Sequence, residues 1–93
     1  MIISFASKET ELIFNEFVSR SYPGDIQRTA LRKLRIIEAA TSINDLRVPP
    51  GNRLEKLSGD REGQYSIRIN DQWRLVFRWT EAGPNEVDII DYH

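Results

Sequence analysis

The chain has 93 residues and a mass of 10.8 kDa, with 40% apolar, 29% charged and 10% aromatic side chains, which is enough for one small hydrophobic core and too little for two. The absence of cysteine and the single histidine, His93, exclude disulfides, thiolate metal sites and a histidine-rich zinc site. A net charge of −1 argues against a nucleic-acid-binding domain, because such domains normally carry a basic excess.

The sequence contains neither a basic leader followed by an apolar stretch nor an apolar run long enough to span a membrane. We therefore expect one domain over residues 1–93, located in the cytoplasm, with no membrane contact, no cofactor and no metal.

The first half of the chain predicts a strand and two helices. Residues 1–5 are apolar and partly β-branched, which favours a strand. Ser7 is placed to cap a helix of about three turns with an apolar stripe: Leu12, Ile13, Phe17 and Val18. Asp25 is placed to cap a longer helix whose apolar residues recur every three or four positions: Ile26, Ala30, Leu34 and Ile37.

The second half predicts a non-helical linker and then four strands. Residues 43–52 contain Pro49-Pro50-Gly51 and are expected to be an ordered linker. Period-two alternation after it predicts strands at residues 53–57, 64–69, 72–79 and 86–92. The fold class is therefore α+β, in the order βααββββ, with two N-terminal helices packed on a curved, mainly antiparallel sheet.

The hairpin of residues 64–79 has a predictable register. Its apolar residues alternate, so Ile67 must oppose Leu75 on the core side, and Arg68 must then oppose Arg74 on the other face, with Arg78 further along. Like charges in opposed positions destabilise a sheet. One interpretation is that the guanidinium groups turn into water or find carboxylate partners; the other is a face that binds phosphate. The aromatic residues Trp73, Phe77 and Trp79 share the apolar parity, which favours the core over a base-stacking platform.

Three separated motifs now resemble the HigB toxins, a branch of the RelE superfamily. They are Pro49–Glu55, Gly59–Arg74 and the terminal Asp91-Tyr92-His93. The resemblance covers essentially the whole chain and implies a RelE-like fold. It also implies a ribosome-dependent mRNA endonuclease that acts in the A site, with a HigA-like helix-turn-helix antitoxin as partner and operator DNA contacted only through that antitoxin.

The chemistry of RNA cleavage without a metal is compatible with this resemblance. It needs a base for the 2′-OH proton, a cation for the charged phosphorane and an acid for the departing 5′-oxygen. By the resemblance, Arg68 and Arg74 match arginines that contact the scissile phosphate, and Asp91, Tyr92 and His93 match the C-terminal catalytic group. Glu55 stands where some HigB relatives have histidine and the YoeB branch has glutamate, so we expect it to be the base and His93 the acid.

Each of these roles has a plainer alternative. Glu55 alternates with its neighbours and could be a solvated strand residue. His93 is terminal, and terminal residues are often frayed, although its own α-carboxylate favours the imidazolium form that suits an acid. Tyr92 could stack on a base, contact the phosphate, or cover the core at a sheet edge.

The basic residues are concentrated in the middle of the chain, which the net charge does not reveal: residues 20–78 hold twelve of the thirteen Lys and Arg. Candidates for contact with mRNA or ribosomal RNA are Arg53, Lys56, Arg61 and Arg78, together with Arg28, Arg32, Lys33 and Arg35 of the second helix. The alternative for the helix is a solvated basic surface. Ser58 stands where relatives often have lysine, so one positive contact is missing. The acidic ends predict a weak, salt-sensitive grip on free RNA.

Two other functions are compatible with the same scaffold. One is a non-catalytic protein that binds a target such as DNA gyrase, as in the ParE branch, whose members lack this arginine and histidine set. The other is a weakened toxin that acts mainly as a partner of its antitoxin.

Overall fold

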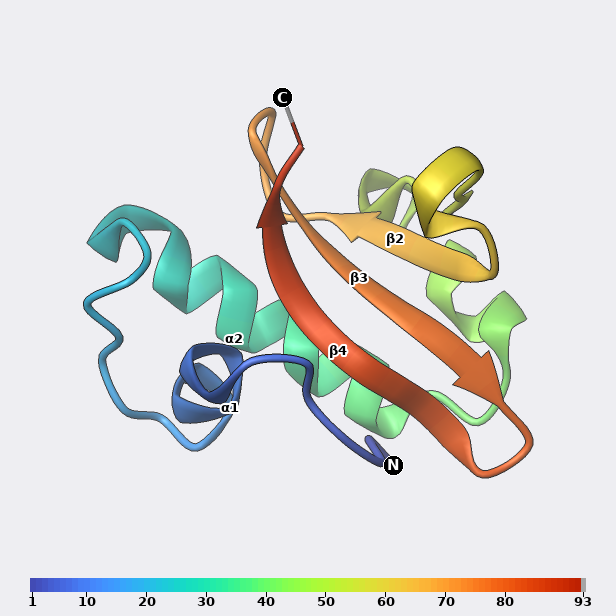
Figure 1. Ribbon diagram of the computed structural model, residues 1–93, viewed down its shortest axis with the longest axis horizontal. Coiled ribbons are helices and arrows are strands. Elements are labelled where there is room, and N and C mark those ends of the chain that lie inside the picture. The colour runs from blue at the N-terminus through green and yellow to red at the C-terminus, as the bar shows by residue number, and fades with distance from the viewer. Residues whose placement is uncertain (93) are drawn as a thin grey trace.

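The computed structural model describes residues 1–92 and consists of two helices packed on a four-stranded antiparallel sheet (Figure 1). The expected α+β class is confirmed. The elements, in chain order, are α1 (Lys8–Phe14), α2 (Gly24–Ala39), the 3₁₀ turns η1 (Ile43–Arg47) and η2 (Pro50–Asn52), β1 (Glu55–Lys56), the 3₁₀ turn η3 (Gly59–Arg61), β2 (Gln64–Arg68), β3 (Trp73–Thr80) and β4 (Gly83–Asp91).

The sheet has the order β1-β2-β3-β4, so every strand pairs with its neighbour in the chain. The predicted hairpin register is confirmed: Ile67 lies opposite Leu75, and Arg68 opposite Arg74. A β-bulge interrupts the pairing of β3 with β4 between Val76 and Arg78. Every strand except β1 is longer than four residues, and β3 and β4 form the curved centre of Figure 1.

Residues 1–5 do not form the expected strand. They lie along the outer edge of β4, where Phe5 makes a single parallel bridge to Val87 (Figure 1). Ser4 bonds the side chain of Asn85, and Ser7 Oγ donates to Asp88 Oδ1 over 2.9 Å. Three backbone bonds also tie this segment to β4, from Ile3 N–H to the Pro84 carbonyl, from Val87 N–H to the Ser4 carbonyl and from Ala6 N–H to the Val87 carbonyl. The pairing amounts to a single bridge and not to a strand, so the observed order is ααββββ.

The helix ends also differ from the sequence-based prediction. Ser7 caps α1 as expected, because its Oγ accepts from the N–H of Thr10, but α1 ends at Phe14, so Phe17 and Val18 lie beyond it and are exposed. The second helix starts at Gly24 after Pro23, without a side-chain cap, and Asp25 lies in its first turn. The linker of residues 43–52 contains two short 3₁₀ turns, where no helical structure was expected.

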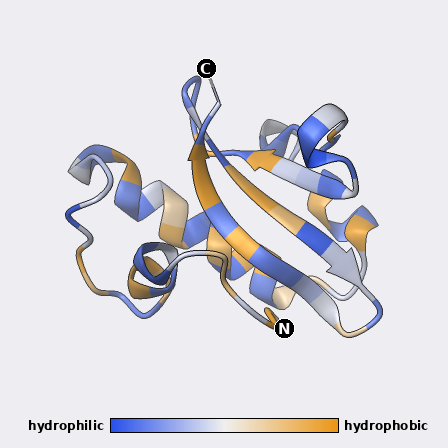
Figure 2. Cartoon of the chain, in the orientation of Figure 1, coloured by the Kyte–Doolittle hydropathy of each residue, from blue (hydrophilic) through white to orange (hydrophobic). Residues whose placement is uncertain are grey.

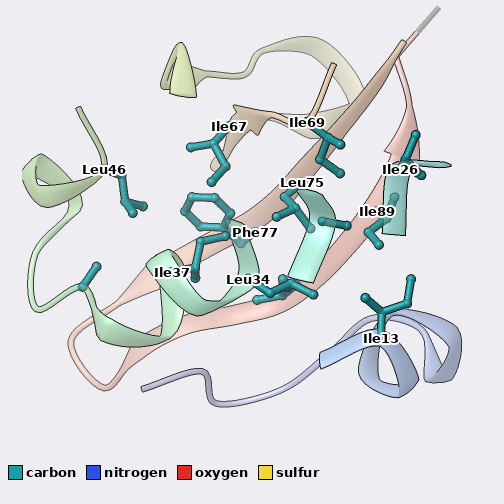
Figure 3. Packing of buried hydrophobic residues seen from close by; sticks show 13 residues of the cluster. Ile13, Ile26, Leu34, Ile37, Leu46, Ile67, Ile69, Leu75, Phe77 and Ile89 are labelled. Carbon is teal, nitrogen blue, oxygen red and sulfur yellow. The ribbon is translucent and has the colours of Figure 1, made fainter. Parts of the chain in front are cut away.

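The hydrophobic core lies between α2 and the inner face of the sheet. Leu34 and Ile37 of α2 face Leu75 and Phe77 of β3, and Ile13 of α1 closes one end (Figure 3). The middle of β3 is continuously hydrophobic at Leu75, Val76 and Phe77, all of them buried, and hydrophilic residues stand on either side of this stretch (Figure 2). The prediction that Trp73, Phe77 and Trp79 face the core is confirmed, with Phe77 buried and both tryptophans packed against the cluster.

No helix within residues 1–92 is long and apolar enough to cross a membrane.

Candidate active site on the outer face of the sheet

The outer face of the sheet brings a carboxylate and a cation together across three strands. Glu55 of β1 lies opposite Ser66 of β2, and Ser66 lies opposite Val76 of β3. Arg74 lies two residues from Val76 along β3, on the same face of the sheet. Ser66, Arg74 and Val76 are all buried, although they point away from the core. The sheet is therefore closely packed beneath this row, and only Glu55 is open to solvent.

Arg74 is held from three sides. Its Nη1 lies 3.1 Å from Glu55 Oε1, and its Nη2 donates to the carbonyl oxygen of Arg53 over 2.6 Å. The ring centroid of Tyr92 lies 5.1 Å from the guanidinium carbon, within the range of a cation–π contact. Only 7% of Arg74 is exposed, while the Glu55 side chain is 48% exposed. The guanidinium group is thus a fixed positive charge beside an accessible carboxylate.

Two buried polar atoms near this pair have no hydrogen-bond partner within the described chain: Arg74 Nε and Ser66 Oγ. The guanidinium fork of Arg74 consequently retains donor capacity that its three neighbours do not use.

A polar hollow of 290 Å³ opens beside the pair. It is lined by Glu55, Lys56, Leu57, Ser58, Asp60, Arg61 and Tyr92. Arg61 Nη1 donates to Gln64 Oε1 over 3.1 Å, so it stands at the rim with its charge available. The hollow thus combines two cations, two carboxylates and an aromatic ring, and its cations and ring can contact a phosphodiester and an adjacent base.

The other two arginines of the hairpin have separate partners. Arg68 pairs with Asp71, in the turn between β2 and β3, while Arg78 Nε lies 3.2 Å from Glu86 Oε2 and Arg78 Nη1 donates to the Glu62 carbonyl over 3.4 Å. The interpretation that the guanidinium groups find carboxylate partners therefore describes all three arginines. The structure does not join Arg68 and Arg74 in one contact.

The C-terminal motif is only partly assembled around Arg74. Tyr92 contacts the guanidinium group, whereas Asp91 accepts from Gln72 Nε2 over 2.9 Å, opposite Trp73. The expected acid, His93, lies outside the described residues. Within residues 1–92, no group of three acidic or histidine side chains is placed to hold a metal ion.

Lys33 corrects the expected basic surface of the second helix. Its side chain is buried, and its Nζ donates to Asn52 Oδ1, while Asn52 Nδ2 donates to the carbonyl oxygens of Leu46 and Val48. Burial lowers the pKa of Lys33, and the nearby charges of Arg32 and Arg68 lower it further. Lys33 therefore fastens the linker to α2 and is not available to RNA. Arg28, Arg32 and Arg35 do lie on the exposed face.

Asn52 and Ser66 are the residues near the site that the sequence did not single out. Asn52 is fully buried and precedes Arg53, whose φ of 46° lies in the left-handed region and whose carbonyl accepts from Arg74. The Pro-Pro-Gly-Asn sequence predicted a turn here, but it did not indicate that the Asn52 side chain would bond Lys33 or that the Arg53 carbonyl would bond Arg74. The alternation along β2 predicts that Ser66 points to the outer face of the sheet, but it does not predict that Ser66 is buried there.

Comparison with known proteins identifies the fold and the family of this chain. A solved structure described as the YoeB-YefM complex from Staphylococcus aureus matches 100% of this chain and 95% of that chain, with a TM-score of 0.61 and 22% identity, so the two share a fold. Residues 3–93 match the family model for the RelE-like toxin of type II toxin-antitoxin system HigB. The chain is thus a RelE-like toxin by class, and it belongs to the HigB-like family.

Two curated relatives agree with that family. Toxin HigB-1 of Vibrio cholerae is 42% identical over 83 residues, covering 88% of this chain and 87% of the relative. Endoribonuclease HigB of Proteus vulgaris is 36% identical over an alignment that covers 100% of both chains.

Proposed function

We propose that this toxin is a ribosome-dependent endoribonuclease that cleaves mRNA in the A site and so inhibits translation and growth. The observation that carries the proposal is Arg74, a nearly buried guanidinium group fixed between Glu55 and Tyr92, two residues that line a polar hollow. The Proteus vulgaris relative is named an endoribonuclease, which supports RNA as the substrate.

The residues divide the chemistry as follows. Arg74 binds the scissile phosphate and stabilises the negative charge that develops on it, with Arg68 as a second cation after release from Asp71. Glu55 takes the proton of the 2′-OH, and the resulting alkoxide attacks phosphorus to give a cyclic phosphate. His93 protonates the departing 5′-oxygen, Tyr92 positions the nucleotide, and Asp91 orients the C-terminal segment. Three protein groups thus fill the roles of base, cation and acid without a metal.

The Glu55–Arg74 contact has a consequence for this sequence of events. While Arg74 Nη1 faces Glu55, the carboxylate and the phosphate compete for the same guanidinium group. A bound phosphate turns the fork toward substrate and leaves Glu55 free to accept the proton. The carbonyl of Arg53 holds Nη2 throughout, which limits how far the guanidinium group moves.

Binding of RNA extends from the hollow to its basic rim. Lys56 and Arg61 line the hollow. Arg78 lies opposite Gln64 of β2, and Arg53 is an exposed residue between η2 and β1 whose carbonyl holds Arg74. Their number is small, and the ends of the chain are acidic, so free RNA binds weakly and the ribosome supplies most of the recognition.

A cytoplasmic toxin of this kind requires a partner that restrains it. We propose a HigA-like helix-turn-helix antitoxin, with operator DNA bound only through that antitoxin. The family assignment to a type II system supports an antitoxin partner.

The test is a translating extract to which purified toxin is added, with cleavage ends mapped by primer extension. We expect cuts at codons in the A site, 2′,3′-cyclic phosphate or 3′-phosphate ends, and intact mRNA when ribosomes are omitted. Intact mRNA in the translating extract contradicts the proposal. Inhibition of gyrase supercoiling by the same preparation would then assign the chain to the gyrase-binding alternative, and the lack of both effects would favour a weakened toxin.

A further inference from the structure

The position of the Arg74 guanidinium group is set by a short segment outside its own strand. Arg74 Nη2 donates to the carbonyl oxygen of Arg53 over 2.6 Å, and Arg74 Nη1 lies 3.1 Å from Glu55 Oε1. Arg53 follows η2, and Glu55 begins β1 two residues later. The placement of both terminal nitrogens of Arg74 therefore depends on how residues 53–55 are held against the rest of the molecule.

This segment is fixed to the sheet at one end and to α2 at the other. Glu55 lies opposite Ser66 in the pairing of β1 with β2, but β1 has only two residues, so this pairing alone gives weak support. Asn52, just before the segment, is completely buried, and its Oδ1 accepts from the Nζ of Lys33, a residue of α2. The bond between Asn52 and Lys33 therefore determines where the chain leaves η2 and approaches Arg74.

Arg53 has a backbone conformation that its neighbours must maintain. Its φ of 46° and ψ of 56° lie in the left-handed region, which is uncommon for a residue with a side chain. The preceding turn is closed by backbone bonds from Asn52 N–H to the Pro49 carbonyl and from Arg53 N–H to the Pro50 carbonyl. The Asn52 side chain adds two bonds to carbonyls of the linker before the turn. An uncommon conformation that is held from several sides, next to a site cation, points to a role for its geometry.

Stability alone does not require a charged group next to Asn52. Lys33 is only 5% exposed, and burial of an ammonium group costs free energy unless the group is well bonded. Apolar side chains of similar volume often replace buried ionic groups without loss of stability. A directed bond from Nζ to Oδ1, unlike an apolar contact, fixes the location of the Asn52 amide. Lys33 thus serves the geometry of residues 52–53 more than the packing of the core.

We propose that Asn52 is a positioning residue for Arg74. Anchored by Lys33, Asn52 holds Arg53 in the left-handed conformation, and the Arg53 carbonyl then fixes the guanidinium group where the scissile phosphate binds. This inference rests on the proposed function and adds the groups that keep its central cation in place. Lys33 and Asn52 are buried and act on the reaction only through the backbone of Arg53.

The first test compares two replacements of Arg53. Arg53→Gly and Arg53→Val both remove the side-chain charge, but glycine adopts the left-handed conformation readily, whereas β-branched valine does not. Arg53→Val should cleave mRNA about ten- to a hundredfold more slowly than Arg53→Gly in a translating extract, because the cation is then misplaced. Both variants should associate with ribosomes equally, so that the difference lies in the cleavage step. Equal cleavage rates, or a difference confined to ribosome association, overturn the proposal.

The second test observes Arg74 directly by NMR and needs no nuclease activity. Contacts at both Nη atoms hinder rotation of the guanidinium group, so the wild type should give separate Nη1 and Nη2 signals. Lys33→Met removes the anchor but keeps a side chain of similar volume. It should merge the two signals and slow cleavage about tenfold or more, whereas Lys8→Met, the same change at an exposed position, should do neither.

Separate signals in Lys33→Met, or merged signals without slower cleavage, contradict the role proposed for Asn52. A wild-type toxin that does not cleave mRNA would overturn the nuclease proposal instead. The NMR comparison would then still decide whether the Lys33–Asn52 bond positions Arg74, so the two failures can be told apart.

Discussion

The outer face of the sheet and the outer face of α2 both present arginines, but in different states. On the sheet, Arg74 is 7% exposed and is fixed by Glu55, the Arg53 carbonyl and Tyr92. On α2, Arg28 and Arg32 are exposed, without partners among residues 1–92, and border apolar side chains. A preorganised cation suits a site where charge develops during a reaction, whereas exposed cations beside apolar side chains suit a binding surface.

The largest expected effect separates Arg74 from another arginine of the same strand. Arg74→Ala removes the fixed cation from the phosphate and should slow mRNA cleavage about 10²–10³-fold in a translating extract. Arg78→Ala, on the same strand and paired with Glu86, is the matched control and should lose no more than about fivefold, since it contacts only the rim. Equal losses in both variants would mean that the two arginines do not differ in the way proposed here.

The next effect concerns stability and Asn52. Asn52→Ala leaves the buried Lys33 Nζ and the carbonyls of Leu46 and Val48 without the bonds that Asn52 supplies. We expect a loss of about 3 kcal/mol in the free energy of unfolding, measured by urea denaturation. Asn44→Ala, at an exposed position of the same linker, is the control and should cost less than about 0.5 kcal/mol. A small effect of Asn52→Ala would show that the Lys33–Asn52 bond does not fasten the linker to α2, and Lys33 would again be a candidate for RNA contact.

A smaller effect of opposite sign is expected at Ser66. Its hydroxyl is buried without a partner in the described chain, so Ser66→Ala removes an unsatisfied polar group. Stability should rise by up to about 1 kcal/mol, and cleavage should remain at the wild-type rate. Reduced cleavage by a well-folded Ser66→Ala variant would instead show that this hydroxyl serves the site.

The smallest effect lies outside both surfaces, at Asp45. Backbone N–H groups of Thr41 and Ser42 donate to its carboxylate and lower its pKa. A pKa that is lower in the folded than in the unfolded protein stabilises the fold above the ordinary pKa, and this contribution is lost as the pH falls through the lowered value. The difference in melting temperature between the wild type and Asp45→Asn should therefore shrink in acid. A constant difference from neutral pH to pH values below the lowered pKa would contradict the assignment.

The fold could be predicted where one pattern determined the answer. The alternating apolar residues of the hairpin admitted a single register, which placed Arg68 opposite Arg74, and Ser7 marked the start of α1. The extent of the opening segment and the end of α1 could not be predicted. Residues 3–6 pair with β4 through three backbone bonds that make only one bridge, and Phe17 and Val18 continue the apolar pattern beyond the helix.

The candidate site could be predicted as a set of residues but not as a geometry. The motifs named Glu55, Arg74 and Tyr92, which the structure brings together, and also Asp91 and Arg68, which have other partners. The burial of Lys33 depends on an amide nineteen residues away, and helical periodicity contains no information on such a partner.

The central claim is that Glu55 transfers a proton beside the cation of Arg74, and Glu55→Gln tests it most directly. The glutamine keeps a side-chain oxygen that can accept from Arg74 but cannot take the 2′-OH proton. We predict that the cleavage rate per ribosome-bound mRNA falls about 10²–10⁴-fold, with ribosome association unchanged. Cleavage by Glu55→Gln at the wild-type rate would contradict the account.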